Sequence, residues 1–171
     1  MKQIGFGGGC HWCTEGVFQA LRGVVQVDQD FVQSKAPADS WAEGVVVRFD
    51  PAIIDLRTLA DVHLRTHSAN GIYSPGGRYR SAIYVFEPDQ RLDAARSIAE
   101  FANEKGEAPR TLVLPFIGFK PSEARYQNYY RTDPDSRSAA ATSIPSSTIS
   151  DAISPSLPCP LEYERARRRE A

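Results

Sequence analysis

The chain of 171 residues is poor in several features that would point to a particular class of protein. It has no apolar run approaching the roughly 20 residues that a membrane helix needs, and its N-terminus lacks the apolar segment of a signal peptide. Its 20 basic and 21 acidic residues leave a net charge of −1, so nothing favours nucleic acid or an anionic membrane as a partner. Three cysteines are too few and too unevenly spaced for a disulfide framework. We therefore expect a cytoplasmic protein without membrane or nucleic-acid partners.

The remaining composition is that of one ordinary globular domain. Hydrophobic residues make up 42% and charged residues 24% of a chain long enough to bury a real core. Apolar residues recur at alternating and helical spacings between Gly, Pro and Asp. Strands are predicted at residues 2–6, 24–31, 44–49, 79–86 and 111–114, and helices at residues 10–22, 56–67, 87–103 and 122–130. Strands that alternate with helices predict an α+β fold, with helices packed on a mixed sheet.

Two patterns predict which sides of these elements are buried. In the strand at 24–31, Val25, Val27 and Gln29 alternate with polar neighbours, which indicates a half-buried strand. In the helix at 87–103, the face toward the sheet is expected at Leu92, Ala95, Ile98, Ala99 and Ala102.

The composition changes near Asp133. The stretch that follows is rich in Ser, Ala and Pro and shows no sustained period, which is typical of a flexible or loosely docked tail. We therefore predict a catalytic domain over residues 1–132 and an irregular C-terminal tail over residues 133–171.

The most informative motif is a cysteine pair, Cys10 and Cys13, which follows three glycines and precedes a predicted helix. Backbone N–H groups and the helix dipole favour negative charge at a helix N-terminus. A cysteine held there is stabilised as the thiolate, the nucleophilic form. We therefore expect Cys10 to be the reactive residue and Cys13, one turn further on, to be more sheltered.

Three alternatives to a catalytic nucleophile are open for this pair of cysteines. A structural zinc site wants four ligands, and the chain adds to the pair only three scattered histidines and Cys159. A thioredoxin-type redox pair follows a strand and precedes a helix, as here, but usually carries Gly-Pro or a similar pair where this chain has His11 and Trp12. Both cysteines could also be small buried residues without reactivity.

Four blocks of sequence, in order over residues 2–132, resemble the peptide methionine sulfoxide reductase A family. The first is Gly-Gly-Cys-His-Trp-Cys at residues 8–13, where the family has Gly-Gly-Cys-Phe-Trp followed by Gly or Cys. The others are Ala-Glu-Gly-Val at 42–45 with Phe-Asp-Pro at 49–51, Tyr-Arg-Ser-Ala-Ile-Tyr at 79–84, and Pro-Phe at 115–116 with Gln-Asn-Tyr-Tyr at 127–130. The resemblance implies a ferredoxin-like α/β roll.

The resemblance also implies an activity. Members reduce the S epimer of methionine sulfoxide, free or in a protein, without a cofactor, and thioredoxin restores the reduced enzyme. We expect the same substrate and partner here, and a monomer. A diverged homologue with weak activity, or a general thiol–disulfide exchanger or redox sensor, is the alternative.

The matched positions assign roles to four catalytic candidates. The resemblance makes Cys10 the nucleophile, Glu43 the acid and Tyr79 a hydrogen-bond donor to the sulfoxide oxygen. Burial in a partly apolar site is expected to raise the pKa of Glu43, so that its carboxyl group can donate a proton. The sulfenic acid left on Cys10 would then condense with a second thiol, for which we expect Cys13, with Cys159 in the tail as the alternative.

The expected substrate-binding residues include three departures from the family pattern. Trp12 matches the family and would form a wall of the methyl pocket. His11 replaces a phenylalanine, and either lowers the thiolate pKa or lines the pocket in its neutral form. Phe31 replaces a tyrosine and cannot donate a hydrogen bond, and Ser74 replaces an aspartate. A glutamine of the pattern falls on Arg78, so the polar recognition positions are altered while the cysteine turn is kept.

Overall fold

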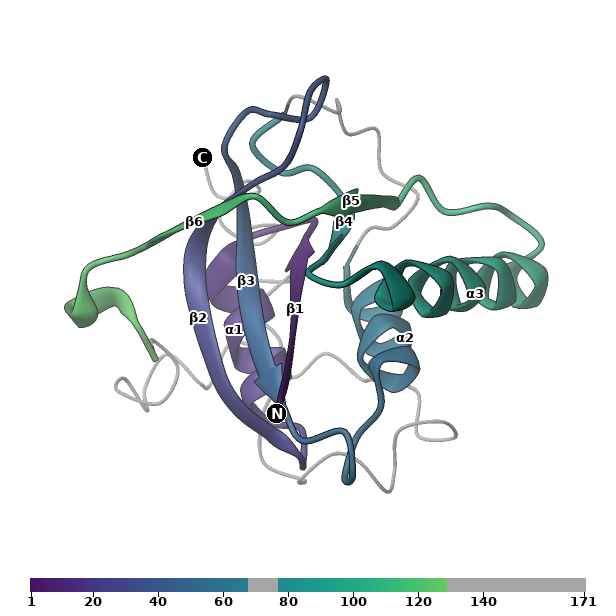
Figure 1. The fold of residues 1–171 in the computed structure, drawn as a ribbon, viewed down its shortest axis with the longest axis horizontal. Helices are drawn as coiled ribbons and strands as arrows, with labels where there is room; N and C mark the ends of the chain where they lie inside the picture. Colours follow the sequence, from purple (N-terminus) through teal and green to yellow (C-terminus); the bar gives the residue numbers. More distant parts are fainter. Residues whose placement is uncertain (68–76, 129–171) are drawn as a thin grey trace, which may run out of the picture.

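The structure is a computed structural model, which describes residues 1–67 and 77–128 (Figure 1). The predicted tail, Ser74 and Cys159 lie outside the described residues. The strands are β1 (Lys2–Gly7), β2 (Val24–Gln33), β3 (Ala42–Phe49), β4 (Ala82–Val85), β5 (Leu112–Pro115) and β6 (Gly118–Pro121). The helices are α1 (His11–Gln19), α2 (Leu56–Thr66) and α3 (Pro88–Lys105), with a 3₁₀ turn, η1 (Ala124–Tyr126).

The six strands form one mixed sheet in the order β5-β4-β1-β3-β2-β6. All neighbours are antiparallel except β4 and β5, which are parallel. The elements from β1 to β4 run βαββαβ, and their strands lie in the order β4-β1-β3-β2, which is the ferredoxin-like arrangement. The expected α+β fold, a mixed sheet with helices packed on it, is confirmed.

The main hydrophobic core lies between the sheet and the helices. In Figure 1, α1 lies behind β2 and β3, while α2 and α3 lie together beyond β1. Because side chains alternate along a strand, Ile4 and Phe6 of β1 point into this core, where Phe6 stacks on Phe18 of α1 at 4.5 Å between ring centres. A smaller cluster around Tyr84 covers the other face of the sheet. Strand β3 is therefore buried on both sides, as its valine-rich sequence indicates.

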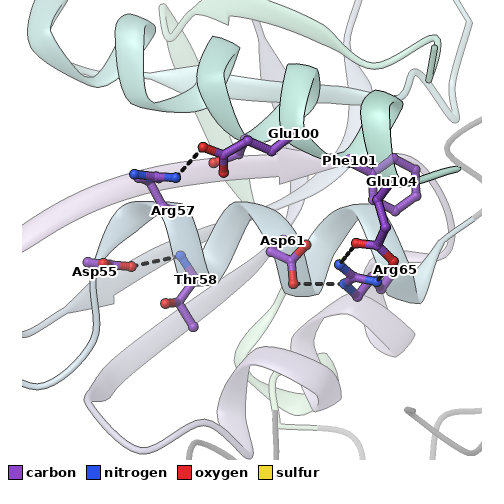
Figure 2. A pocket seen from close by; sticks show the side chains of 9 residues that line it. Asp55, Arg57, Thr58, Asp61, Arg65, Glu100, Phe101 and Glu104 are labelled. Carbon is purple, nitrogen blue, oxygen red and sulfur yellow. Dashed lines mark hydrogen bonds and ion pairs between the residues drawn. The ribbon is translucent and has the colours of Figure 1, made fainter. Parts of the chain in front are cut away.

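Helices α2 and α3 meet across a groove lined by charged residues (Figure 2). Arg65 donates from Nε to Asp61 at 2.8 Å and from a terminal nitrogen to Glu104 at 2.9 Å, and Arg57 pairs with Glu100. The pairs with Glu104 and Glu100 join the two helices, in addition to apolar contacts of Leu64 with Phe101, whereas Asp61 lies on α2 itself. No helix in the described part of the chain is long and apolar enough to cross a membrane.

The predicted buried face of α3 is wrong at most of its positions, although Ile98 does pack against the core. Leu92 is 56% exposed and Ala95 and Ala99 are also exposed, whereas the buried positions are Gln90, Ala94, Ser97 and Phe101. The reason is a polar anchor at the start of the helix. Gln90 accepts from the backbone N–H of Phe86 at 2.8 Å and donates to the carbonyl oxygen of Gln3 at 2.7 Å. These bonds fix the rotation of α3 and turn Leu92 to solvent.

The last predicted helix, at 122–130, is also different within the described residues. Strand β6, which pairs with β2, ends at Pro121, and the described residues after it form the short 3₁₀ turn η1 in place of the predicted helix. Buried Gln29 holds this segment, because its amide nitrogen donates to the hydroxyl of Ser122 and to the carbonyl oxygen of Tyr126, both at 2.7 Å. These bonds compete with the backbone pattern of a helix.

Two smaller differences lie around the first connection to β2. Helix α1 ends at Gln19 rather than continuing to Gly23, which has φ +95° and turns the chain into the strand. The register with β3 shifts between Val24 and Gln26, and Val25 is 58% exposed. The alternation is thus kept at Val27 and Gln29 and lost at Val25, because a bulge moves one residue out of the pattern.

Candidate active site

Cys10 lies at the junction of β1 and α1, where the glycines allow an abrupt turn. Gly8 has φ +141°, and a Cβ atom at this position would lie 2.5 Å from the ring of His67. Cys10 follows as the N-cap of α1, and its carbonyl oxygen accepts from the backbone and the hydroxyl of Thr14, at 3.2 and 3.1 Å. The cysteine therefore stands at the N-terminus of a helix, as predicted.

The surroundings of Cys10 favour its thiolate. The pKa of Cys10 is lowered to about 6, chiefly by a hydrogen bond from the side chain of Cys13. The backbone amides of Cys13 and Trp12 and the charge of His11 act in the same direction, while burial opposes them. Both cysteines are reduced and partly buried. Cys10 is thus largely ionised at neutral pH.

Glu43 approaches Cys10 from the neighbouring strand. The register that pairs Gly7 with Gly44 brings the N-terminal part of β3 beside the turn before α1. Glu43 is 3% exposed, and its Oε2 lies 2.8 Å from Nδ1 of His11 and 3.3 Å from the backbone nitrogen of the same residue. Its Oε1 accepts from Nε of Arg78 at 2.5 Å. One buried carboxylate thus joins His11 to Arg78.

The ion pair shifts the pKa of both Glu43 and His11. Burial is the largest single influence on Glu43 and raises its pKa, but the bonds from His11 and Arg78 outweigh it, so the pKa is lowered. The expectation of a raised pKa for Glu43 is therefore wrong. For His11, burial lowers the pKa, but Glu43, Cys10 and Asp30 together raise it above its ordinary value. The site favours an ionised Glu43 and a protonated His11.

Aromatic rings surround the imidazole of His11. Trp12 meets it edge-on at 5.7 Å between ring centres, and Phe31 of β2 lies at 6.3 Å. The guanidinium of Arg78 lies over Phe31 at 5.5 Å and over Tyr79 at 5.9 Å from the ring centres. Tyr79 is 45% exposed, so its side chain is open to an incoming molecule.

A second recess beside Cys10 contains uncharged histidines. Cys10, Cys13, His63 and His67 line it together, and the two imidazoles stack at 4.0 Å. His67 donates from Nδ1 to the carbonyl oxygen of His63, and its Nε2 lies 2.7 Å from the hydroxyl of Ser81. Burial lowers the pKa of His67 to about 4 and that of His63 well below its ordinary value. Both are neutral at physiological pH.

The structure brings most of the predicted site residues into one place. Those in contact around the turn and the adjoining strands are Cys10, His11, Trp12, Cys13, Phe31 and Glu43. Tyr79 follows Arg78 at the edge of the group, while Ser74 and Cys159 lie outside the described residues. The ion pair of Arg78 was not predicted, and neither was the histidine stack. The four-residue spacing of His63 and His67 was a usable signal for the stack, because such residues share a helix face.

Within residues 1–67 and 77–128, no group of three or more His, Cys, Asp or Glu side chains lies close enough together to hold a metal ion.

Fold and site together define a class: a ferredoxin-like domain that presents an ionised cysteine at a helix N-terminus beside a buried carboxylate. The chain belongs to the peptide methionine sulfoxide reductase family, whose model matches residues 2–154. It is 32% identical to the peptide methionine sulfoxide reductase MsrA of Deinococcus radiodurans, over 78% of this chain and 72% of that protein. It is 31% identical to an MsrA of Acinetobacter baumannii, over 78% of this chain and 85% of that protein.

Solved structures agree on the fold. Reduced Mxr1 from Saccharomyces cerevisiae superposes with a TM-score of 0.69 at 22% identity, over 78% of this chain and 86% of that chain. The methionine sulfoxide reductase A of Corynebacterium diphtheriae superposes with a TM-score of 0.62 at 23% identity, over 84% of this chain and 77% of that chain. A third structure holds Mxr1 in complex with Trx2, with a TM-score of 0.58 at 22% identity, over 75% and 84%.

Proposed function

We propose that the chain reduces methionine-S-sulfoxide, free or within a protein, to methionine, and that thioredoxin returns it to the dithiol state. The observation that carries the proposal is the thiolate of Cys10 one residue from the ion pair of His11 and Glu43. A sulfoxide sulfur becomes a good electrophile only when its oxygen is protonated or strongly hydrogen-bonded. The site offers a nucleophile and acidic hydrogens together, inside a partly aromatic pocket.

The reaction runs in three steps. The Cys10 sulfur attacks the sulfoxide sulfur, oxygen passes to the cysteine, and methionine leaves with a sulfenic acid formed on Cys10; the substrate gains the two electrons that the cysteine loses. The thiol of Cys13 then displaces water from the sulfenic acid, forming a disulfide. Residues three apart on a helix have Cα atoms about 5–6 Å apart, within the roughly 4.4–6.8 Å of disulfides. The thioredoxin dithiol finally reduces this bond.

The remaining roles are assigned by position. Trp12 and Phe31 form the apolar walls that contact the methyl group, with His11 between them. Tyr79 hydrogen-bonds the sulfoxide oxygen, and Glu43 supplies the negative charge on which proton transfer depends. The relatives named MsrA support the reaction, and the complex of yeast Mxr1 with Trx2 supports the reductant. The proposed location is the cytoplasm, where thioredoxin keeps thiols reduced.

Turnover with separated epimers tests the proposal. Thioredoxin-coupled NADPH consumption is expected with the S epimer and not with the R epimer, and Cys10→Ser should abolish it. Cys13→Ser should yield one methionine per protein and then stop. A folded protein that converts neither epimer but reduces insulin disulfides would instead be a general disulfide exchanger.

A further inference from the structure

Three departures from the family pattern meet around Glu43. His11, where the pattern has phenylalanine, contacts one carboxylate oxygen, and Arg78, where it has glutamine, contacts the other. Phe31, where it has tyrosine, lies 5.5 Å from the guanidinium of Arg78 and 6.3 Å from the ring of His11. Relative to the pattern, two neutral hydrogen-bond donors, the tyrosine and the glutamine, are thus replaced, and two cationic groups contact the same carboxylate. Residues 11, 31 and 78 are far apart in sequence, so this arrangement exists only in the folded site.

The arrangement removes Glu43 as a proton donor. Both of its oxygens are occupied by groups that donate hydrogen to it, and its side chain is 4% exposed. Protonating either oxygen would break the bond from His11 or from Arg78 and leave a buried donor facing a proton. The carboxylate is therefore suited to hold a neighbouring cation in place and unsuited to act as the acid.

We propose that His11, oriented by Glu43, is the acid that protonates the sulfoxide oxygen. Nδ1 of His11 faces the carboxylate, and no described residue forms a hydrogen bond with Nε2 at the opposite edge of the ring. The ring interacts electrostatically with Cys10 and meets Trp12 edge-on, where the substrate methyl group is expected. Glu43 and Arg78 are positioning residues in this scheme. The inference rests on the proposed reduction of a sulfoxide.

The proton balance of the first step is complete with these groups. The Cys10 thiolate attacks the sulfoxide sulfur while the His11 imidazolium gives its proton to the oxygen. The attack forms a sulfur–sulfur bond, and the protonated oxygen then passes from the substrate sulfur to the Cys10 sulfur. The sulfur–sulfur bond and the sulfur–oxygen bond of the substrate both break in this transfer, so that the sulfenic acid stays on Cys10 and neutral methionine leaves. His11 ends neutral and regains a proton from solvent. No further oxidant or reductant is needed until thioredoxin acts.

The charged groups around His11 determine the pH range in which the proposed reaction can run. They are Cys10 at the start of α1, Asp30 on β2, Glu43 on β3 and Arg78 in the segment before β4. The three anions favour the imidazolium, and Arg78 keeps Glu43 ionised. The productive state needs an ionised Cys10 and a protonated His11. The rate of the first step should therefore increase with pH through about pH 6, where Cys10 ionises, and decrease again at higher pH as His11 loses its proton.

The test measures methionine formed in a single turnover, without reductant, from the full-length protein and free methionine-S-sulfoxide at pH 5–9. His11→Phe, which restores the residue of the pattern, should slow this step about 100-fold near pH 7 and remove the falling limb. Glu43→Gln should move the falling limb to lower pH. The double variant His11→Phe with Phe31→Tyr regains a neutral hydrogen-bond donor. Its rate of methionine formation should be at least about tenfold higher than that of His11→Phe alone. Iodoacetamide alkylation at pH 8 checks that the Cys10 thiolate persists in each variant.

Three results would overturn the inference. An unchanged rate and falling limb in His11→Phe would show that the imidazole gives no proton. A larger loss in Glu43→Gln than in His11→Phe would return the acid to the carboxyl group. A folded double variant without recovery would place the effect of His11 outside proton donation.

Failure of the inference can be told apart from failure of the proposed function. If the unmodified protein forms no methionine from either epimer, the function is wrong whatever His11 does. An NMR titration of the His11 ring, compared with Glu43→Gln, still reports on the pair. Its pKa should lie above the ordinary value in the unmodified protein and lower in the variant, and equal values would refute the pairing itself.

Discussion

Removing the Cys13 thiol should raise the pKa of Cys10 from about 6 toward a range of about 7–8. The difference between the ordinary value of 9.0 and about 6 corresponds to about 4 kcal/mol in favour of the thiolate. The hydrogen bond from Cys13 is the largest contribution, and such a bond to a charged group is worth about 1.5–3 kcal/mol. At pH 7 the ionised fraction of Cys10 should then fall from about 90% to about 10–50%.

The assay is the rate of iodoacetamide alkylation as a function of pH, with mass spectrometry to assign the label to Cys10. Cys13→Ala removes the donor, whereas Cys13→Ser keeps an O–H group of similar position and is the matched control. The alkylation midpoint should therefore move upward in the alanine variant and stay near its original value in the serine variant.

Two outcomes would refute the assignment. An alanine variant with the original midpoint would show that the helix N-terminus and His11 hold the thiolate without Cys13. Equal upward shifts in both variants would show that the volume of the side chain matters and its hydrogen does not.

Three further predictions concern stability. Gly8→Ala should lower the melting temperature, at a cost of at least about 1–3 kcal/mol, because its φ of +141° disfavours a side chain and the new Cβ meets the ring of His67; Gly9→Ala, which has open space, should change it little. Urea unfolding should show a lower free energy of unfolding at pH 5 than at pH 7, because between pH 6.5 and 4 the unfolded chain binds a proton at His67 that the folded chain excludes. The contribution of His67 to this decrease is about 2 kcal/mol at pH 5. In His67→Gln the decrease in the free energy of unfolding should be smaller by that amount. Arg65→Ala should lower the urea midpoint more than Arg57→Ala, because the side chain of Arg65 is 12% exposed and joins two carboxylates while that of Arg57 is 47% exposed and joins one; equal midpoints would contradict the contribution of the pair network.

Local features of the fold could be predicted from the sequence because their causes are local. The valine run of β3 and the apolar spacing of α2 each report burial directly, and both elements occur where they were expected. The buried face of α3 could not be predicted from its apolar residues. Its rotation depends on the bonds of Gln90 to Phe86 and Gln3, and neither bond leaves a mark on the periodicity of the helix.

The same distinction applies to the site. The position of Cys10 depends on the glycines before it and the helix after it, all within one short segment, and it was predicted. The ionisation of Glu43 was predicted with the wrong sign, because burial alone would raise its pKa. The two groups that reverse the shift, His11 and Arg78, reach it only through the pairing of β1 with β3 and the course of the chain before β4. Such pairings cannot be deduced from spacing in one sequence.

The histidines around Cys10 differ in charge, which bears on how the proposed reaction proceeds. His11, the acid of our proposal, pairs with Glu43, whereas the neutral imidazoles of His63 and His67 line the recess that also contains Cys13. Of these three histidines, His11 is the one suited to protonate a sulfoxide oxygen, because His67, with a pKa of about 4, and His63, with a pKa well below its ordinary value, are not imidazolium ions at neutral pH. The thiol of Cys13 lines the same recess and already forms a hydrogen bond with the sulfur of Cys10. In the proposed mechanism the thiol that resolves the sulfenic acid is therefore already in contact with the sulfur that carries it.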